Sequence, residues 1–306
     1  MTKSIALLFP GQGSQYVGMG NRYANSPIFK LADASLKFGL SEIMLRGPSE
    51  QLGLTKITQP AILTYSIILF EELKRFGLKI GHVLGHSLGE YSALVAAGTL
   101  SFEDAIKAVH LRGQFMQEAV PEGEGKMYAL LGAIPENVSN ICQEIGNVIP
   151  ANFNEPNQIV ISGLAKSADR VVGILKELQP TGLRVMELKV SAPFHSPLMK
   201  PAAFKLEEAF SDFSFKENNL SYIANLDANE YAPKTPVTTI KKNLIGQVYS
   251  SVLWHQSFSK LPENTLCIEV GPGKVLSGLA KKIDPNIQVI NLDTEDGFNN
   301  LEKALQ

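Results

Sequence analysis

Short apolar runs alternate with segments of helical period along most of this chain of 306 residues. Residues 5–9 (IALLF) form the first apolar run, and residues 59–76 carry apolar side chains at helical spacing behind Thr58, a plausible N-cap. A further run over 80–84 precedes a helical segment over 88–97. Such alternation is typical of an α/β fold with a largely parallel sheet.

The middle of the chain follows a different pattern. After a linker at 121–125 (PEGEG), we expect a strand (126–131), a helix (135–145), two strands (148–153 and 158–162), a helix (167–178) and a strand (183–188). That order, βαββαβ, is typical of a ferredoxin-like unit. Beyond a loop at 191–197 we expect several helices and two late strands, over 265–270 and 287–292.

The two patterns together predict two domains. We expect a core domain of residues 1–124 and 190–306, with a small ferredoxin-like subdomain inserted at 125–189. A chain of this length suits that division, because single hydrophobic cores stop growing at about 250–300 residues.

Composition limits the classes of partner and compartment. The formal net charge is −2 and we find no long basic run, so nucleic acid is not an expected partner. Polar residues interrupt the apolar stretch at 61–70, and the N-terminal run is too short for a signal segment, so we expect neither a membrane span nor processing. Cys142 and Cys267 lie far apart without metal-ligand spacing, which suits a reducing cytoplasm.

Gly85-His86-Ser87-Leu88-Gly89 stands between a predicted strand and a predicted helix. Gly-x-Ser-x-Gly in that context is the signature of a nucleophile elbow, in which a tight turn lifts the serine hydroxyl clear of the backbone. The alternative is a turn whose serine only caps the helix. The strand and helix on either side favour Ser87 as a nucleophile.

An elbow also places the serine at a helix N-terminus, where free N–H groups can stabilise an oxyanion. The N–H of Leu88 is the natural first donor. A second should come from another loop that follows a strand, and the loop at 9–15 (FPGQGSQ), with Gln12 at its centre, is one candidate. That loop could equally be an ordinary glycine-rich turn.

A serine nucleophile needs a base, and the chain contains five histidines. His86 adjoins the serine and would have to fold back across the turn, so we set it aside as the base. His82 and His110 lie where structural histidines are common. His195 follows a predicted strand in a loop, a usual place for catalytic residues, and His255 remains the second choice.

Arg112 lies on the helix that follows the elbow helix, for which Ser101 and Asp104 form a possible capping box. A planar guanidinium can bind a carboxylate through two parallel hydrogen bonds, as recognition of an acidic acyl group would require. Spacing alone does not separate this role from that of a surface arginine.

Taken together, these residues resemble malonyl-CoA:acyl carrier protein transacylases and the related acyltransferase domains of polyketide synthases. The similarity covers essentially the whole chain, in separate blocks that stand in the same order. They are FPGQGSQ (9–15), GHSLGEYSAL (85–94), LRGQFMQEAVPEG (111–123), ANFN and QIVISG (151–163), FHS in APFHSPLM (192–199) and EVGPGKVLSGL (269–279).

The resemblance implies an α/β-hydrolase-like core with a ferredoxin-like insert and an active site between them. It implies that Ser87 is the nucleophile, His195 the base and Arg112 the residue that binds the malonyl carboxylate. The oxyanion hole would be formed by the main-chain N–H groups of Gln12 and Leu88. We also expect Gln12 and His86 to contact the substrate.

Two further positions follow from the same resemblance. In this family a main-chain carbonyl orients the histidine, and the local pattern over 247–254 assigns it to Leu253, although a glutamine is usual there. Phe194 resembles the malonyl-selecting form of its motif, because a bulky ring leaves little room for an α-methyl group. Simple packing is the alternative explanation for Phe194.

The implied reaction is a ping-pong transfer from malonyl-CoA to the phosphopantetheine thiol of an acyl carrier protein, in fatty acid or polyketide biosynthesis. It requires no metal and no bound cofactor. One alternative is a thioester hydrolase with the same elbow, which would have no use for a buried arginine. Another is a non-catalytic module that docks carrier proteins, in which Ser87 or His195 would be lost.

Overall fold

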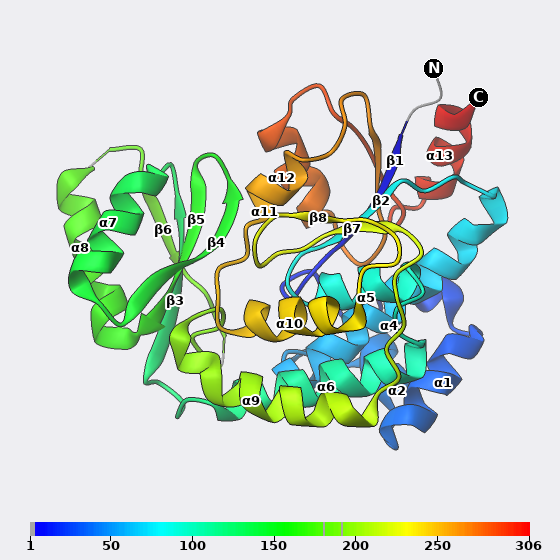
Figure 1. The fold of residues 1–306 in the computed structure, drawn as a ribbon, viewed down its shortest axis with the longest axis horizontal. Helices are drawn as coiled ribbons and strands as arrows, with labels where there is room; N and C mark the ends of the chain where they lie inside the picture. The colour runs from blue at the N-terminus through cyan, green and yellow to red at the C-terminus, as the bar shows by residue number, and fades with distance from the viewer. Residues whose placement is uncertain (1–3, 180, 191) are drawn as a thin grey trace.

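The computed structural model describes residues 4–179, 181–190 and 192–306, which contain two β-sheets (Figure 1). The larger sheet is parallel except at one edge, where β7 and β8 pair antiparallel. Its strand order is β10 (Gln288–Asn291), β9 (Leu266–Glu269), β1 (Ile5–Phe9), β2 (His82–Gly85), β7 (Ser221–Ile223) and β8 (Glu230–Tyr231).

Both faces of this sheet are buried, as a parallel sheet requires. Alternate residues of β1 point to opposite sides: Leu7 and Phe9 join one hydrophobic core, and Ala6 and Leu8 join another. Side chains from α4 (Thr55–Leu73), α5 (Gly89–Ala96) and α6 (Phe102–Glu118) pack in the first core, and those from α11 (Trp254–Phe258) and α12 (Val275–Ile283) in the second.

Six more α-helices among the described residues surround this part of the molecule (Figure 1). They are α1 (Pro27–Leu36), α2 (Leu40–Arg46), α3 (Ser49–Leu52), α9 (Lys200–Ala209), α10 (Val237–Val248) and α13 (Gly297–Leu305). Of these, α10 matters most for the site, because its last turn reaches the carboxyl end of β2.

The second sheet is antiparallel, with the order β4 (Val148–Glu155), β5 (Gln158–Leu164), β3 (Gly125–Leu131) and β6 (Arg184–Glu187). Helices α7 (Pro135–Ile145) and α8 (Ala165–Leu178) cover its outer face, at the left of Figure 1. Tyr128 and Leu130 pack against these helices, whereas Met127 and Ala129 belong to the core of the larger part. Because successive side chains of a strand point to opposite faces, one face of this sheet packs against its own helices and the other against the rest of the molecule.

The predicted helix over 59–76 begins earlier than expected. It is α4, which starts at Thr55 and is followed by the short helix η2 (Lys74–Phe76), so the expectation that Thr58 is the N-cap is wrong. The helix continues through Pro60, which cannot donate to the carbonyl of Lys56. Nδ1 of His110 lies 2.8 Å from that carbonyl oxygen, so His110 is a structural histidine.

Most other elements lie where the sequence predicts them. The α/β class is confirmed, β1 has the predicted bounds, and the Ser101 side chain caps α6 by accepting from the Asp104 N–H. Two groups of elements were not predicted: α1 to α3, for which we had no expectation, and β7 and β8, which occupy a region where we expected only helices. Of the loop predicted at 191–197, Ser191 lies outside the described residues.

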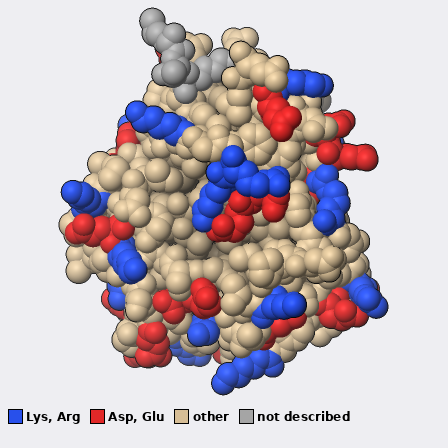
Figure 2. Space-filling model, turned by 90° about the vertical axis from the view of Figure 1, so that its right-hand side faces the viewer, with Lys and Arg blue, Asp and Glu red and all other residues tan. Residues whose placement is uncertain are grey.

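Charge is distributed without strong segregation on the face that Figure 2 presents. Basic and acidic side chains lie intermixed across it, in keeping with the formal net charge of −2. No helix in the described part of the chain is long and apolar enough to cross a membrane.

Candidate active site

The turn between β2 and α5 requires both of its glycines. A Cβ at Gly85 would lie 1.9 Å from the carbonyl carbon of Gly89, and one at Gly89 would lie 2.0 Å from the carbonyl oxygen of Phe9. Ser87 has a φ of 52°, in the left-handed region, where side chains other than glycine are strained. The turn therefore has the strained geometry expected of a nucleophile elbow.

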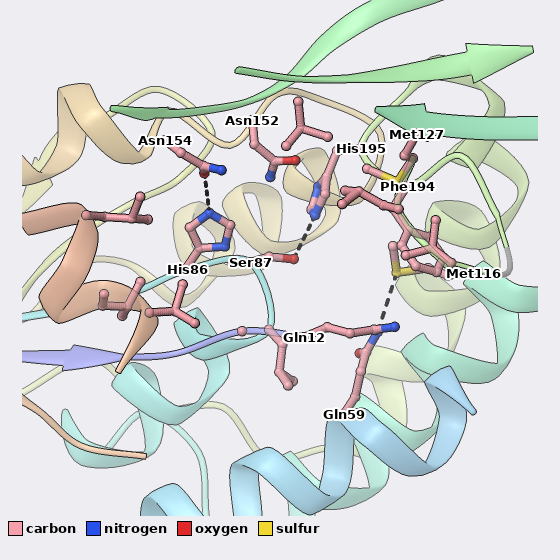
Figure 3. Close-up of a pocket in the computed structure, with 18 of the residues that line it drawn as sticks. Gln12, Gln59, His86, Ser87, Met116, Met127, Asn152, Asn154, Phe194 and His195 are labelled. Atoms are coloured by element: carbon pink, nitrogen blue, oxygen red, sulfur yellow. Dashed lines mark hydrogen bonds between the residues drawn. The ribbon is translucent and has the colours of Figure 1, made fainter. Parts of the chain in front are cut away.

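Ser87 and His195 are in hydrogen-bond contact, with 2.7 Å between Oγ and Nε2 (Figure 3). On the other side of the ring, Nδ1 lies 2.9 Å from the main-chain oxygen of Gln247. Because a carbonyl can only accept, Nδ1 carries the proton and Nε2 is left to accept from the serine hydroxyl. The imidazole is thus in the tautomer that a general base requires.

The expectation that Leu253 supplies the orienting carbonyl is wrong, because Gln247 supplies it. The carbonyl of Leu253 accepts from the N–H of Ser257 and so begins helix α11. Gln247 lies in the last turn of α10. Main-chain carbonyls there have no N–H donor within the helix, so they can accept hydrogen bonds from other groups. The glutamine that the resemblance leads us to expect is therefore present, six positions earlier than we assigned it.

The other histidines have different partners. His86 faces away from the serine and lies 2.8 Å, through Nε2, from Oδ1 of Asn154 on β4 (Figure 3). Its ring also lies 5.5 Å from that of Trp254, centroid to centroid. His82 contacts Glu230, and His255 is the second residue of α11. Of the five histidines, His195 is the one whose ring is hydrogen-bonded to Ser87.

Arg112 is buried at the same place, with 1% of its surface exposed, so it is not a surface arginine. Its Nη2 donates to Oγ of Ser87 over 3.1 Å and to Oε1 of Gln247 over 2.9 Å. Its Nη1 donates to Oε1 of Gln59 over 2.8 Å. The acceptors are all neutral, and the Nε atom has no partner in the described structure. A buried cation whose hydrogen-bond acceptors are all neutral is suited to binding an anion.

Burial and charge shift the pKa values of these groups. Burial, and next the positive charge of Arg112, lower the pKa of His195 to about 3, so the ring is neutral at pH 7. Burial also lowers the pKa of His86. Glu90, buried behind the elbow, has its pKa raised by burial to about 7.

Gln12 and Leu88 line the same cavity as Ser87. The loop that carries Gln12 packs tightly on the elbow, since a Cβ at Gly11 would lie 2.4 Å from the carbonyl oxygen of His86. Within the described part of the chain, neither main-chain N–H donates to a protein acceptor. Both are therefore available to an oxyanion at the serine.

The cavity has a volume of about 190 Å³ and lies between the two sheets (Figure 3). One wall is formed by side chains of the four-stranded sheet, among them Met127, Asn152 and Asn154. Phe194 lies on another wall, next to His195, and is 6% exposed. The ring therefore borders the space in which an acyl group on Ser87 would lie.

Four polar residues of the site were missed by the sequence reasoning. Gln59 and Gln247 accept from Arg112, and Asn225 accepts from the N–H of Ser87 over 2.6 Å. Glu90 accepts from the N–H of Asn225 and from Nε2 of Gln247. The only available signal was position: Glu90 stands in the elbow helix within GHSLGE.

A family model and similar curated proteins give a consistent result. A family model described as an acyl transferase domain matches residues 6–283. A malonyl CoA-acyl carrier protein transacylase from Bacillus subtilis is 44% identical over 313 residues, covering 99% of this chain and 96% of that protein. One of the same name from Haemophilus influenzae is 42% identical over 315 residues, covering 99% of each.

Solved structures give the same result. The crystal structure of an acyl carrier protein S-malonyltransferase from Vibrio cholerae has a TM-score of 0.91 and 38% identity, covering 97% of this chain and 99% of that one. A malonyl-transacylase solved in complex with its type II PKS acyl-carrier protein has a TM-score of 0.91 and 36% identity, covering 98% and 99%.

Proposed function

The chain belongs to the malonyl-CoA:acyl carrier protein transacylase family, and from that premise we propose that it moves a malonyl group from malonyl-CoA to a carrier protein through an ester on Ser87. The acceptor is the phosphopantetheine thiol of an acyl carrier protein of fatty acid or polyketide biosynthesis. The observation that carries the proposal is the contact between the buried Arg112 guanidinium and Oγ of Ser87.

In the first half-reaction, Nε2 of His195 takes the proton of the Ser87 hydroxyl as Oγ attacks the thioester carbonyl carbon. The carbonyl oxygen becomes an oxyanion that accepts hydrogen bonds from the N–H groups of Gln12 and Leu88. When the C–S bond breaks, the histidine returns the proton to the sulfur, and coenzyme A leaves as a thiol.

In the second half-reaction the roles are reversed. The carrier thiol gives its proton to His195 and attacks the malonyl ester, and the same two N–H groups stabilise the second oxyanion. Oγ of Ser87 then leaves and recovers the proton. Between the two steps, the malonyl carboxylate remains bound to Arg112.

The substrate carboxylate also improves the base. The positive charge of Arg112 is one cause of the low pKa of His195. A carboxylate bound to Arg112 offsets that charge, so the pKa of His195 rises when malonyl-CoA binds. A substrate without a carboxylate leaves the base weaker, which adds to the preference for malonyl over acetyl.

We also propose that residues 1–124 and 190–306 form an α/β-hydrolase-like core and residues 125–189 a ferredoxin-like insert. Support comes from the parallel sheet with the elbow after β2 and from the β4-β5-β3-β6 order of the second sheet. The proposed chemistry uses no metal and no bound cofactor. A cytoplasmic location is in keeping with two free cysteines.

The test is transfer of the malonyl group from isolated malonyl-enzyme. The adduct should decay much faster with holo acyl carrier protein than in buffer, and malonyl-carrier protein should appear at the same rate. Apo carrier protein, which lacks the thiol, is the matched control. Decay in water as fast as with holo carrier protein would make the chain a thioester hydrolase.

A further inference from the structure

Gln247 makes hydrogen bonds to four groups of the site while remaining fully buried. Its main-chain oxygen accepts from His195, and its side-chain Oε1 accepts from Arg112 over 2.9 Å. Its Nε2 donates to the main-chain oxygen of Ser87 over 3.1 Å and to Oε2 of Glu90 over 2.7 Å. One residue therefore connects the base, the nucleophile and the arginine.

The orientation of the Gln247 amide needs a cause, because its oxygen and nitrogen ends have nearly the same shape. If the amide were turned by 180°, its NH₂ group would face the donors of Arg112, and its oxygen would face the Glu90 carboxyl group. Both contacts would be lost. Two acceptors favour the observed orientation, and Oε2 of Glu90, at 2.7 Å from Nε2, is nearer than the main-chain oxygen of Ser87, at 3.1 Å. Oε2 is itself held by the N–H of Asn225 over 3.0 Å.

Glu90 does this from behind the site. It is 1% exposed, and neither Glu90 nor Gln247 is among the described residues that line the cavity. Arg112 has no carboxylate partner within the described part of the chain. The Gln247 amide thus stands between Arg112 and Glu90 and prevents a direct ion pair, which would use the donors needed by a substrate carboxylate.

We propose that Glu90 is a positioning residue that orients the Gln247 amide toward Arg112 and thereby sets the preference for acyl groups that carry a carboxylate. It acts as a hydrogen-bond acceptor and does not contact the substrate. The proposal rests on the proposed function, since it concerns the selectivity of that same site.

Two substitutions of Glu90 separate the acceptor from the charge. In Glu90→Gln, the amide oxygen can take the place of Oε2, so Gln247 keeps its orientation although the charge is gone. In Glu90→Met, a side chain of similar length offers no oxygen. The readout is the ratio of kcat/KM for malonyl-CoA to kcat/KM for acetyl-CoA, measured as single-turnover acylation of Ser87.

We expect Glu90→Met to lower this ratio by at least about tenfold, as loss of an oriented hydrogen bond to a charged group should, and Glu90→Gln to keep it within roughly twofold. Most of the loss should appear in KM for malonyl-CoA. A Glu90→Gln protein with the low ratio would overturn the proposal, and so would a Glu90→Met protein with the wild-type ratio.

Gln247→Met tests the same interaction by changing its other partner. It can be measured even if Glu90→Met does not fold. It removes the side-chain amide but keeps the main-chain carbonyl that orients His195. We expect the same loss of selectivity, and no further loss when Glu90→Met is added, because the two residues act in series. An unchanged ratio in Gln247→Met, or additive losses in the double variant, would contradict the proposal.

Glu269→Met is the matched control, since Glu269 is the other glutamate buried in the described part of the chain and binds Ser277 and Asn291 instead of Gln247. It should lower stability without changing the ratio, and an equal change there would overturn the proposal. If only the proposal for Glu90 is wrong, the wild-type enzyme still forms the malonyl adduct. If the proposed function is wrong, no adduct forms.

Discussion

The guanidinium of Arg112 donates a hydrogen bond from Nη2 to Oγ of Ser87 over 3.1 Å, so the anion-binding group and the nucleophile touch. A carboxylate that accepts hydrogen bonds from Arg112 therefore lies beside the serine. The carboxylate of a short acyl group attached to Ser87 must lie at the same place. This contact connects substrate choice to the chemistry of transfer.

Arg112→Ala should abolish the preference for malonyl over acetyl. The malonyl carboxylate loses a charged, two-point partner, so the ratio of kcat/KM for the two thioesters should fall by roughly 100-fold. Parallel acylation assays measure this. Lys107→Ala, which removes an exposed cation from the same helix, is the control and should keep the wild-type ratio. Retained selectivity in Arg112→Ala would mean that another group binds the carboxylate.

Acylation should persist into mildly acidic solution. Because the pKa of His195 is lowered to about 3, the neutral ring that accepts the proton is present at every pH well above that value. The pH dependence of kcat/KM reports on the free enzyme. We therefore expect that kcat/KM for malonyl-CoA does not fall to half its plateau value near pH 6.5, the ordinary pKa of histidine. A half-loss at that pH would place the base in a more solvated environment than the structure shows.

Gly89→Ala should destabilise the fold by roughly 2 kcal/mol or more, because the added methyl group meets the carbonyl oxygen of Phe9. Urea unfolding measures this change. Gly278→Ala is the matched control, since an added Cβ there meets nothing within 4 Å. In helix α12 it should stabilise by about 0.5–1 kcal/mol. Equal effects of the two substitutions would contradict the steric account of the elbow.

Phe194→Ser should admit an α-methyl group. The ring borders the cavity, and removing it leaves space beside His195. We expect the rate with methylmalonyl-CoA, relative to malonyl-CoA, to rise by about tenfold, which is within the range that one methyl group contributes to specificity. Competition between the two thioesters measures this directly. An unchanged ratio would mean that Phe194 only packs the wall of the cavity.

Local signals in the sequence predicted much of the fold. The Gly-x-Ser-x-Gly turn and the Ser101 cap each involve neighbours within a few residues, and both appear as expected. The start of α4 was misplaced because we expected Thr58 as its N-cap, whereas the helix begins at Thr55 and continues through Pro60. The carbonyl that Pro60 leaves free is bound by His110, from a different helix, which no local pattern reveals.

The polar network around the nucleophile could not be predicted, because its partners are far apart in the chain. Gln247 is 160 residues from Ser87, and Gln59 is 53 residues from Arg112. The misassignment to Leu253 has the same origin. Only the packing of α10 against the elbow decides which carbonyl of residues 247–254 meets His195, and no spacing rule supplies that contact.

The central claim is that Ser87 carries the malonyl group, and intact-mass measurement after incubation with malonyl-CoA tests it most directly. Wild-type protein should gain one malonyl group, peptide mapping should place it on Ser87, and Ser87→Ala should gain none. An adduct of the same yield on Ser87→Ala, or no adduct on the wild-type protein, would contradict the account.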